Sequence, residues 1–259
     1  MKLTKYGRRE WLGSGALAFI LILLSIILAA LGAFTFGTAL YLLVFIILLW
    51  VALAAFFRDP EREIPASATS VVSPADGVIR DIELLKCDSC ESEDLKKLFA
   101  GKDMLRIGIF LSVFDVHLNR APVDWTLSFK YYKKGAFHDA RDGRAGRENE
   151  SMLAGGVGSI DGIRFPVAVK QISGAVARRI VCPVEPGAVL KKGERYGMIK
   201  FGSRTELYLP AGKCFEVNVK VGDRVFGGTT IVADILPAAK EKNFFSEDSG
   251  PCACAEEKK

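Results

Sequence analysis

Residues 201–210 read Phe-Gly-Ser-Arg-Thr-Glu-Leu-Tyr-Leu-Pro. The stretch is expected to form a strand, yet it carries a Gly-Ser bond where a strand should hold only packing residues. Glycine tolerates backbone angles that other residues resist, so the peptide bond before Ser203 can bend toward that residue's own hydroxyl. Attack of the Ser203 oxygen on the Gly202 carbonyl, followed by β-elimination and hydrolysis, would leave an N-terminal pyruvoyl group. Gly-Ser is also a common turn dipeptide. These two residues alone therefore do not decide between a self-cleavage site and an ordinary turn.

Two nearly uncharged apolar runs lie near the N-terminus, Trp11 to Leu31 and Phe36 to Phe57. Each run has about 20 residues, enough for a helix to cross a bilayer. The connection, residues 32–35, is too short and too apolar to be a domain, so the sequence predicts a transmembrane helical hairpin over residues 1–57. The alternatives are a generic anchor and a hairpin that dips into one leaflet. A cleavable signal peptide is disfavoured, because a second run follows and no convincing small-residue cleavage site is present.

The basic residues near the hairpin predict its orientation. They lie before the first run and after the second, while the connection is uncharged: Lys2, Lys5, Arg8, Arg9, Arg58 and Arg62. By the positive-inside rule, both ends face the cytoplasm. The expected location is therefore the cell membrane, with the following domain on the cytoplasmic face.

Length and charge limit the possible classes of protein. The chain has 259 residues and a formal net charge of +5. No basic tract with interleaved aromatic residues occurs, so nucleic acid is not expected as a partner. Residues 58–237 are enough for one substantial domain with its own core. The remaining tail, residues 238–259, is rich in Glu, Lys and Ser and is expected to be flexible.

Short apolar stretches punctuated by glycine and proline favour strands over helices after the hairpin. Strands are expected at residues 70–73, 77–82, 105–111, 165–169, 216–221 and 230–235, and helices at Glu93 to Ala100 and around Met152 to Gly155. Two segments, residues 184–193 and 219–228, resemble the turn-strand-turn units of lipoyl- or biotinyl-like domains. The predicted fold class is α+β, mainly β: the hairpin followed by one β-rich domain with barrel-sandwich-like character.

Three titratable residues are candidates for proton transfer. His117 follows a strongly apolar stretch, and a loop at the end of a strand can aim its side chain into a pocket; the alternative is a hydrogen-bonded, partly buried histidine. His138, the other histidine, lies in a charged loop and is interpreted as solvated surface. Asp76 precedes a glycine and has the pattern of a turn aspartate.

Four segments taken together resemble the phosphatidylserine decarboxylase family in order and spacing. They are Ser73-Pro74-Ala75-Asp76-Gly77, Phe114-Asp115-Val116-His117-Leu118-Asn119-Arg120-Ala121-Pro122, residues 171–181 and Phe201-Gly202-Ser203-Arg204. Arg58-Asp59-Pro60-Glu61-Arg62 resembles the short, membrane-anchored bacterial and archaeal branch, which includes enzymes similar to archaetidylserine decarboxylase. The resemblance covers essentially residues 5 to 237.

The resemblance implies a pyruvoyl-dependent decarboxylase and zymogen. Autocatalytic cleavage between Gly202 and Ser203 would convert Ser203 into the pyruvoyl group and leave two associated chains. The ketone would form a Schiff base with a serine phospholipid, phosphatidylserine or archaetidylserine, and yield the ethanolamine phospholipid and CO2. No metal or diffusible cofactor is implied. The resemblance is compatible with an oligomer.

Roles for the titratable residues follow from the same resemblance. Our hypothesis is that Asp76 fixes the tautomer of His117 and that His117 deprotonates Ser203 and later returns a proton to the α-carbon. Many longer family members carry a second histidine where this chain has Arg120, so both roles fall on His117 here.

Closely spaced cysteines raise the question of a metal site. Zinc could be bound by four of the cysteines, Cys87, Cys90, Cys252 and Cys254. However, zinc sites usually pair two Cys-x-x-Cys motifs, and the second pair here is Cys-x-Cys in a polar tail. Free thiols are therefore expected.

One rival function is a membrane-anchored barrel-sandwich adaptor or cofactor carrier, although no Met-Lys pair marks a modified lysine. The other is a lipid-binding or scaffold protein without chemistry.

Overall fold

The computed structural model describes residues 2–87, 92–136, 138, 145–174, 179–200, 203–241 and 244–245. The chain divides into two compact units, Met1–Glu61 and Arg62–Lys259. The first unit is helical and the second is mainly β-sheet. Each unit is described by itself below.

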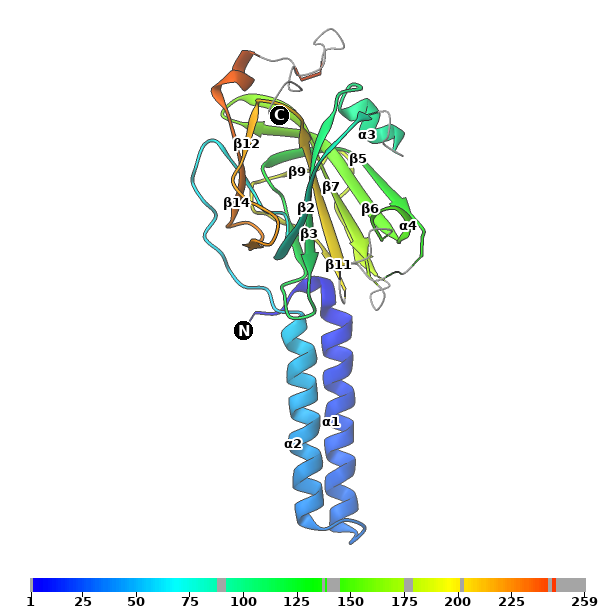
Figure 1. The fold of residues 1–259 in the computed structure, drawn as a ribbon. Helices are drawn as coiled ribbons and strands as arrows, with labels where there is room; N and C mark the ends of the chain where they lie inside the picture. Colours follow the sequence, from blue (N-terminus) through cyan, green and yellow to red (C-terminus); the bar gives the residue numbers. More distant parts are fainter. Residues whose placement is uncertain are drawn as a thin grey trace. The chain divides into compact units, whose positions relative to one another are not determined.

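The first unit is a pair of long antiparallel helices, drawn in blue in Figure 1. A short 3-10 turn, η1 (Lys5–Gly7), leads into α1 (Arg8–Ala30), and α2 (Phe36–Phe56) follows. The second helix begins where the Thr35 hydroxyl accepts a hydrogen bond from the Thr38 amide. Both helices are long and apolar enough to cross a membrane. Large apolar side chains point outward along both, as Phe19 (68% exposed) and Phe45 (63% exposed) illustrate.

The two ends of the hairpin are tied to each other by backbone hydrogen bonds. Leu3 and Arg58 form an antiparallel bridge. The amide of Thr4 donates to the Phe57 carbonyl over 2.9 Å, and the amide of Asp59 donates to Lys2 over 2.8 Å. The chain therefore enters and leaves the hairpin at the same end, which confirms the helical hairpin predicted from the two apolar runs.

The second unit contains antiparallel strands and short helices. Its strands are β1 (Ser70–Val72), β2 (Gly77–Leu85), β3 (Met104–Leu111), β4 (Leu118–Arg120), β5 (Asp124–Lys133), β6 (Ser151–Ile160), β7 (Ile163–Ser173), β8 (Ile180–Val181), β9 (Val189–Leu190), β10 (Arg195–Ile199), β11 (Ser203–Pro210), β12 (Phe215–Val217), β13 (Arg224–Val225) and β14 (Ile231–Ile235). Its helices are α3 (Glu93–Leu98), α4 (Ala145–Glu148) and the 3-10 turn η3 (Pro237–Glu241).

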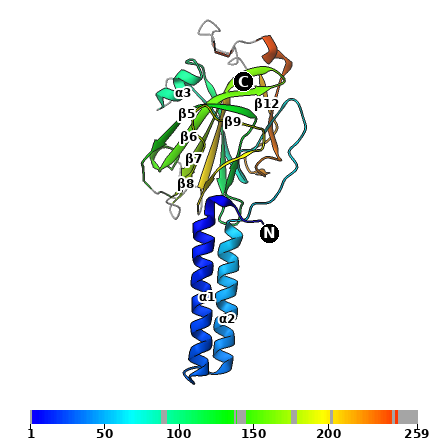
Figure 2. The same ribbon diagram turned by 180° about the vertical axis from the view of Figure 1, so that it is seen from behind.

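Eight strands form the largest sheet, in the order β13-β2-β3-β11-β7-β6-β5-β9. Strands β5, β6 and β7 lie side by side in both ribbon views (Figures 1 and 2). Two three-stranded sheets, β1-β14-β12 and β4-β10-β8, complete the unit. None of these sheets closes into a barrel within the described residues. The mainly β prediction is confirmed, whereas the barrel-sandwich character is not.

The main core covers one face of the large sheet. Strand β11 contributes Leu207 and Leu209 to it, and the aromatic pair Trp125–Tyr196 packs edge to face with ring centroids 5.5 Å apart. The opposite face carries a smaller apolar cluster under α3, which includes Phe99 and Tyr208. Because successive residues of a strand point to opposite faces, β11 presents Ser203 and Thr205 on the core side and Arg204 on the other.

Several expected elements are confirmed and others differ. Helix α3 lies within the expected 93–100, but the helix expected around Met152 to Gly155 is wrong, because these residues form part of β6. The long ladders that β6 forms with β5 and β7 override the local pattern. The strand expected over residues 216–221 ends at Val217. Ala239 and Phe244, near the start of the expected tail, are buried in the main core.

Candidate active site

Ser203 is the first residue of β11, near the middle of the eight-stranded sheet. It pairs with Leu111 of β3 on one side and with Ser173 of β7 on the other. Its side chain is completely buried. Phe201 and Gly202, which precede it, lie outside the described residues. The serine singled out by the sequence therefore lies inside the protein, on the face of the sheet that carries the core.

A short chain of polar side chains lies on the same face as Ser203. Gln171 Nε2 of β7 donates to the side-chain oxygen Oδ1 of Asn119 over 2.7 Å, and Asn119 Nδ2 donates to the Thr205 hydroxyl over 3.0 Å. All three residues are buried. Since Asn119 belongs to β4, these hydrogen bonds hold the β4 segment against the face of the large sheet, next to the beginning of β11.

Three buried oxygen atoms on this face have no hydrogen-bond partner within the described part of the chain. They are Ser203 Oγ, Ser173 Oγ and Gln171 Oε1. Ser203 faces Ser173, and Thr205 faces Gln171, across the same ladder. Buried polar atoms are nearly always hydrogen-bonded, so a group of three without partners is typical of a place reserved for chemistry or for a bound polar group.

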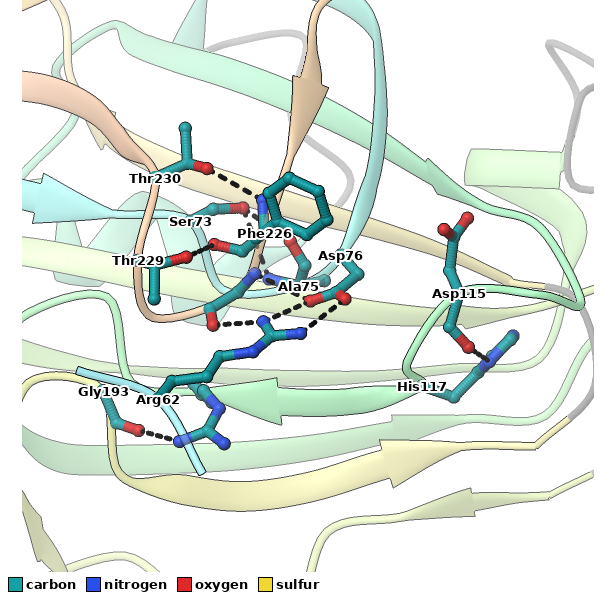
Figure 3. Close-up of polar contacts among 12 residues, drawn as sticks. Arg62, Ser73, Ala75, Asp76, Asp115, His117, Gly193, Phe226, Thr229 and Thr230 are labelled. Carbon is teal, nitrogen blue, oxygen red and sulfur yellow. Dashed lines mark hydrogen bonds and ion pairs between the residues drawn. The ribbon is translucent and has the colours of Figure 1, made fainter. Parts of the chain in front are cut away.

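His117 is completely buried and directly precedes β4. Its carbonyl accepts a hydrogen bond from the Ile199 amide of β10 over 3.1 Å. The ring Nδ1 lies 3.0 Å from the Asp115 carbonyl oxygen. Figure 3 draws this contact as a dashed line. An Nδ1–H that donates to this carbonyl would leave Nε2 as the basic nitrogen, so the backbone itself can select the tautomer that a proton acceptor needs.

Asp76 is held by an arginine and a backbone amide. The Arg62 guanidinium donates to both carboxylate oxygens, over 2.6 and 2.7 Å, and the Gly227 amide donates to Oδ1 over 2.8 Å. Arg62 also donates to the Gly227 carbonyl, and its guanidinium carbon lies 6.0 Å from the Phe226 ring centroid. Figure 3 shows Arg62 facing the Asp76 carboxylate. The role that the sequence predicts for Asp76, to fix the tautomer of His117, stays a prediction.

The segments that carry Asp76 and His117 are adjacent. The Arg120 amide donates to the Pro74 carbonyl over 2.9 Å, and its guanidinium donates to the Gly193 carbonyl over 2.9 Å. Arg120 is buried, and it stands where longer family members are expected to have a histidine. On the other side of His117, the Asp115 carboxylate accepts hydrogen bonds from Arg224 and from the Ser112 amide. The 73–77 turn and the 115–120 segment thus form one structural region.

Gly77 allows this turn to lie close to β3. Its φ of +149° is a conformation that side chains rarely adopt, and a Cβ placed there would lie 2.1 Å from the Phe110 carbonyl oxygen. The turn can therefore approach the end of β3, which pairs with Ser203, only because residue 77 is glycine.

The remaining candidates lie elsewhere. The His138 side chain is one-third exposed and its Nε2 lies 2.9 Å from a Glu148 carboxylate oxygen. Cys90, Cys252 and Cys254 lie outside the described residues, and no group of three or more metal-ligand side chains occurs within the described ones. Burial is the main factor that raises the pKa of the Cys182 thiol, to about 11.

Comparison with known proteins places the chain in a family. The model of the phosphatidylserine decarboxylase family matches residues 51–233. The chain belongs to the phosphatidylserine decarboxylase family. A proenzyme of that name from Carboxydothermus hydrogenoformans is 43% identical over 213 residues, which cover 80% of this chain and 92% of the relative. Another from Aromatoleum aromaticum is 41% identical over 217 residues, covering 84% and 92%.

Several neighbours of the site escape a reading of the sequence. In this phosphatidylserine decarboxylase family member, the structure adds five residues to the expected Ser203, His117 and Asp76: Arg62, Asn119, Gln171, Ser173 and Thr205. One signal is available, because Gln171 and Ser173, like Ser203 and Thr205, are polar residues two positions apart, so each pair points to one face of its strand.

Proposed function

We propose that this chain is a pyruvoyl-dependent phosphatidylserine decarboxylase that cleaves itself between Gly202 and Ser203. Its substrate would be a serine phospholipid, and its products the ethanolamine phospholipid and CO2. The observation that carries the proposal is the buried Ser203 hydroxyl, without a hydrogen-bond partner among the described residues, in a chain of this family. Relatives named as proenzymes support processing of the chain.

Cleavage would proceed through an ester. Ser203 Oγ attacks the Gly202 carbonyl carbon, the C–N bond breaks, and the hydroxyl proton passes to the freed Ser203 nitrogen. Loss of the Ser203 α-proton then breaks the Cβ–O bond, which leaves Gly202 as a carboxylate and residue 203 as dehydroalanine. Tautomerisation to the imine, addition of one water and release of one ammonia give the pyruvoyl group. The steps need a base and a site that admits one water.

His117 is our candidate for that base. Its ring is buried, and the Asp115 carbonyl lies within hydrogen-bond distance of Nδ1, so Nε2 can accept the Ser203 proton. The polar chain from Gln171 through Asn119 to Thr205 supports this role, because it fixes the segment that carries His117 against the beginning of β11. Asp76 and Arg62 would act indirectly, because their ion pair holds the 73–77 turn next to Arg120.

The pyruvoyl group suits the residues around position 203. Its ketone oxygen would take the place of the Ser203 nitrogen, and the former hydroxymethyl carbon would become a methyl group, beside Ser173, whose Oγ is unpartnered among the described residues and can donate a hydrogen bond. Ser173 would therefore hold the group, while Gln171 Nε2 holds Asn119 in place next to it. Once formed, it supplies an electron sink for the amine of the serine head group. His117 would then deliver a proton to the α-carbon of the substrate after CO2 has left.

The helical hairpin supports a membrane location for this reaction. Two helices that are long and apolar enough to cross a bilayer precede the β-rich unit, and basic residues lie at their shared end. We propose that the hairpin anchors the enzyme in the cell membrane with the second unit on the cytoplasmic face. The two chains made by cleavage would stay associated, since β11 pairs with β3 and β7.

The deciding experiment is intact mass under denaturing and reducing conditions, for the wild type and for Ser203→Ala. The proposal expects two fragments that meet at Gly202 and Ser203, the smaller one blocked by a pyruvoyl group, and a single chain in the variant. A single wild-type chain from folded protein would reject the proposal. Incubation of the cleaved enzyme with diacyl and with archaeal ether serine lipids would then identify the lipid class.

A further inference from the structure

Ser203 has a neighbour that is fixed on the opposite face of the sheet. The Arg204 side chain is only 11% exposed, although it points away from the main core. Its Nε donates to Glu206 Oε1 over 2.8 Å, and its Nη2 donates to Asp81 Oδ1 over the same distance. Glu206 belongs to the same strand, β11, whereas Asp81 belongs to β2, two strands away in the sheet.

Arg204 reaches Asp81 by crossing over β3 at a glycine. Gly108 of β3 is paired with Glu206 on one side and with Asp81 on the other. A Cβ at Gly108 would lie 2.4 Å from Arg204 Nη2 and 2.6 Å from Asp81 Oδ1. An irregularity in β2 between Ile79 and Asp81 brings Asp81 into this row. The gap above Gly108 therefore accommodates the ion pair.

The charges of this group are balanced and largely shielded from water. Arg106 donates to Asp81 over 3.3 Å, and the Tyr208 hydroxyl donates to Glu206 over 2.6 Å. Burial alone would raise the pKa of Glu206, but Arg204, the other nearby cations and the Tyr208 hydrogen bond lower it below its usual value. The carboxylates likewise raise the pKa of Arg204 despite its burial. Glu206 is thus stable as a buried anion while Arg204 is present.

We infer that Arg204 is a positioning residue that holds the new N-terminus in place after cleavage before Ser203. This inference rests on the proposed function. Cleavage would make residue 203 a chain end, and chain ends fray unless side-chain contacts hold them. Arg204 is the first residue behind that end, and it joins β11 to β2 across β3. A displacement of about 1 Å in a reacting group can slow a reaction about 100-fold, so a frayed pyruvoyl group would be of little use.

Hydrogen exchange of a peptide that covers residues 203–210 tests the inference. Four proteins are compared: cleaved wild type, cleaved Arg204→Met, uncleaved Ser203→Ala, and the uncleaved double variant. Arg204→Met is expected to speed exchange in this peptide at least about tenfold in the cleaved enzyme, because the end can then open locally. In the uncleaved background, where residue 203 is still tethered to Gly202, the same substitution should have a much smaller effect.

Two further variants sharpen the comparison. Asp81→Asn removes the partner on β2 and leaves the residues next to the cleavage site intact, so it should produce the same selective increase. Lys130→Met is the matched control, since Lys130 of β5 forms an ion pair of 2.6 Å with Glu185 at a distance of three strands from β11. It should leave the exchange of residues 203–210 unchanged in both backgrounds.

The outcomes separate this inference from the proposed function. Equal effects of Arg204→Met and Asp81→Asn on cleaved and uncleaved protein would reduce Arg204 to an ordinary structural residue and overturn the inference, while the pyruvoyl chemistry stood. Unchanged exchange in the cleaved variants would overturn it as well. A wild-type chain that is never cleaved would remove the proposed function, and the inference with it.

Discussion

Arg62 and Asp76 form a two-point ion pair, in which Nη1 lies 2.6 Å from Oδ1 and Nη2 lies 2.7 Å from Oδ2. Both side chains are nearly buried, at 12% and 6% exposure. Arg62 is the first residue of the β-rich unit, directly after the hairpin unit in the chain. The pair therefore fixes the start of the β-rich unit to the turn that lies beside the His117 segment.

Arg62→Met should destabilise the protein and slow cleavage. Removal of one partner from a buried ion pair leaves the other charge uncompensated, at a cost of about 3–5 kcal/mol. Urea unfolding in the uncleaved Ser203→Ala background measures the stability, and a gel time course measures cleavage. Lys96→Met is the control, because the Lys96–Glu93 pair lies on an exposed helix surface. Wild-type cleavage and a stability loss no larger than that of the control would contradict the expectation.

His117→Asn should lose cleavage, decarboxylation or both, because asparagine cannot accept and return a proton near pH 7. Mass spectrometry reports cleavage, and release of CO2 from a serine lipid reports decarboxylation. The matched variant is His138→Asn, which changes a partly exposed histidine beside Glu148 and should retain both activities. Full retention of both activities in His117→Asn would remove His117 from the mechanism.

Gly77→Ala should be far more damaging than Gly222→Ala. Both glycines have positive φ, but an added Cβ at Gly77 would collide with the Phe110 carbonyl oxygen, whereas nothing lies within 4 Å at Gly222. The expected loss of unfolding free energy is at least about 3 kcal/mol at Gly77 and about 1–2 kcal/mol at Gly222. Denaturant titration of uncleaved protein decides between them, and similar losses would show that the close approach to β3 is not essential.

The contribution of Glu206 to stability should depend on pH. Its pKa in the folded protein is lowered from its usual value of 4.5, so the anion is favoured by folding. Its stabilising contribution is therefore complete above pH 4.5 and declines as the pH falls through the lowered folded pKa. The stability difference between wild type and Glu206→Gln, measured by urea unfolding in the uncleaved background, should shrink across this acid range. A difference that stays constant down to the lowest pH would refute the prediction.

Much of the fold follows from local sequence patterns. The two apolar runs specify the helical hairpin through length and lack of charge, and short β-rich stretches such as residues 105–111 specify strands. The helix predicted around Met152 is wrong because the hydrophobic periodicity of this segment is ambiguous between helix and strand. Its pairing with β5 and β7 depends on residues 13 or more positions away, as the Leu153–Tyr131 and Leu153–Lys170 pairs, 22 and 17 positions apart, illustrate, and local propensity does not encode that.

The candidate site is predictable only in part, for a related reason. Ser203, His117 and Asp76 carry recognisable chemistry at the ends of strands or in turns. Their supporting contacts join distant parts of the chain: Asn119 and Thr205 are separated by 86 positions, and Gly227 and Asp76 by 151. Such contacts exist only after the sheets have formed, so no local sequence pattern predicts them.

The central place of β11 has a consequence for how a cleaved enzyme responds to denaturation. After a cut before Ser203, β11, β13 and β14 would belong to one chain, while their partners β3, β7, β2 and β1 would belong to the other. The fold would then have been assembled by a single chain but would be kept by two. Refolding after complete unfolding would require the two pieces to meet again, so recovery should fall on dilution. Refolding of the uncleaved chain involves one molecule, whereas refolding of the cleaved enzyme would depend on the concentration of its two chains.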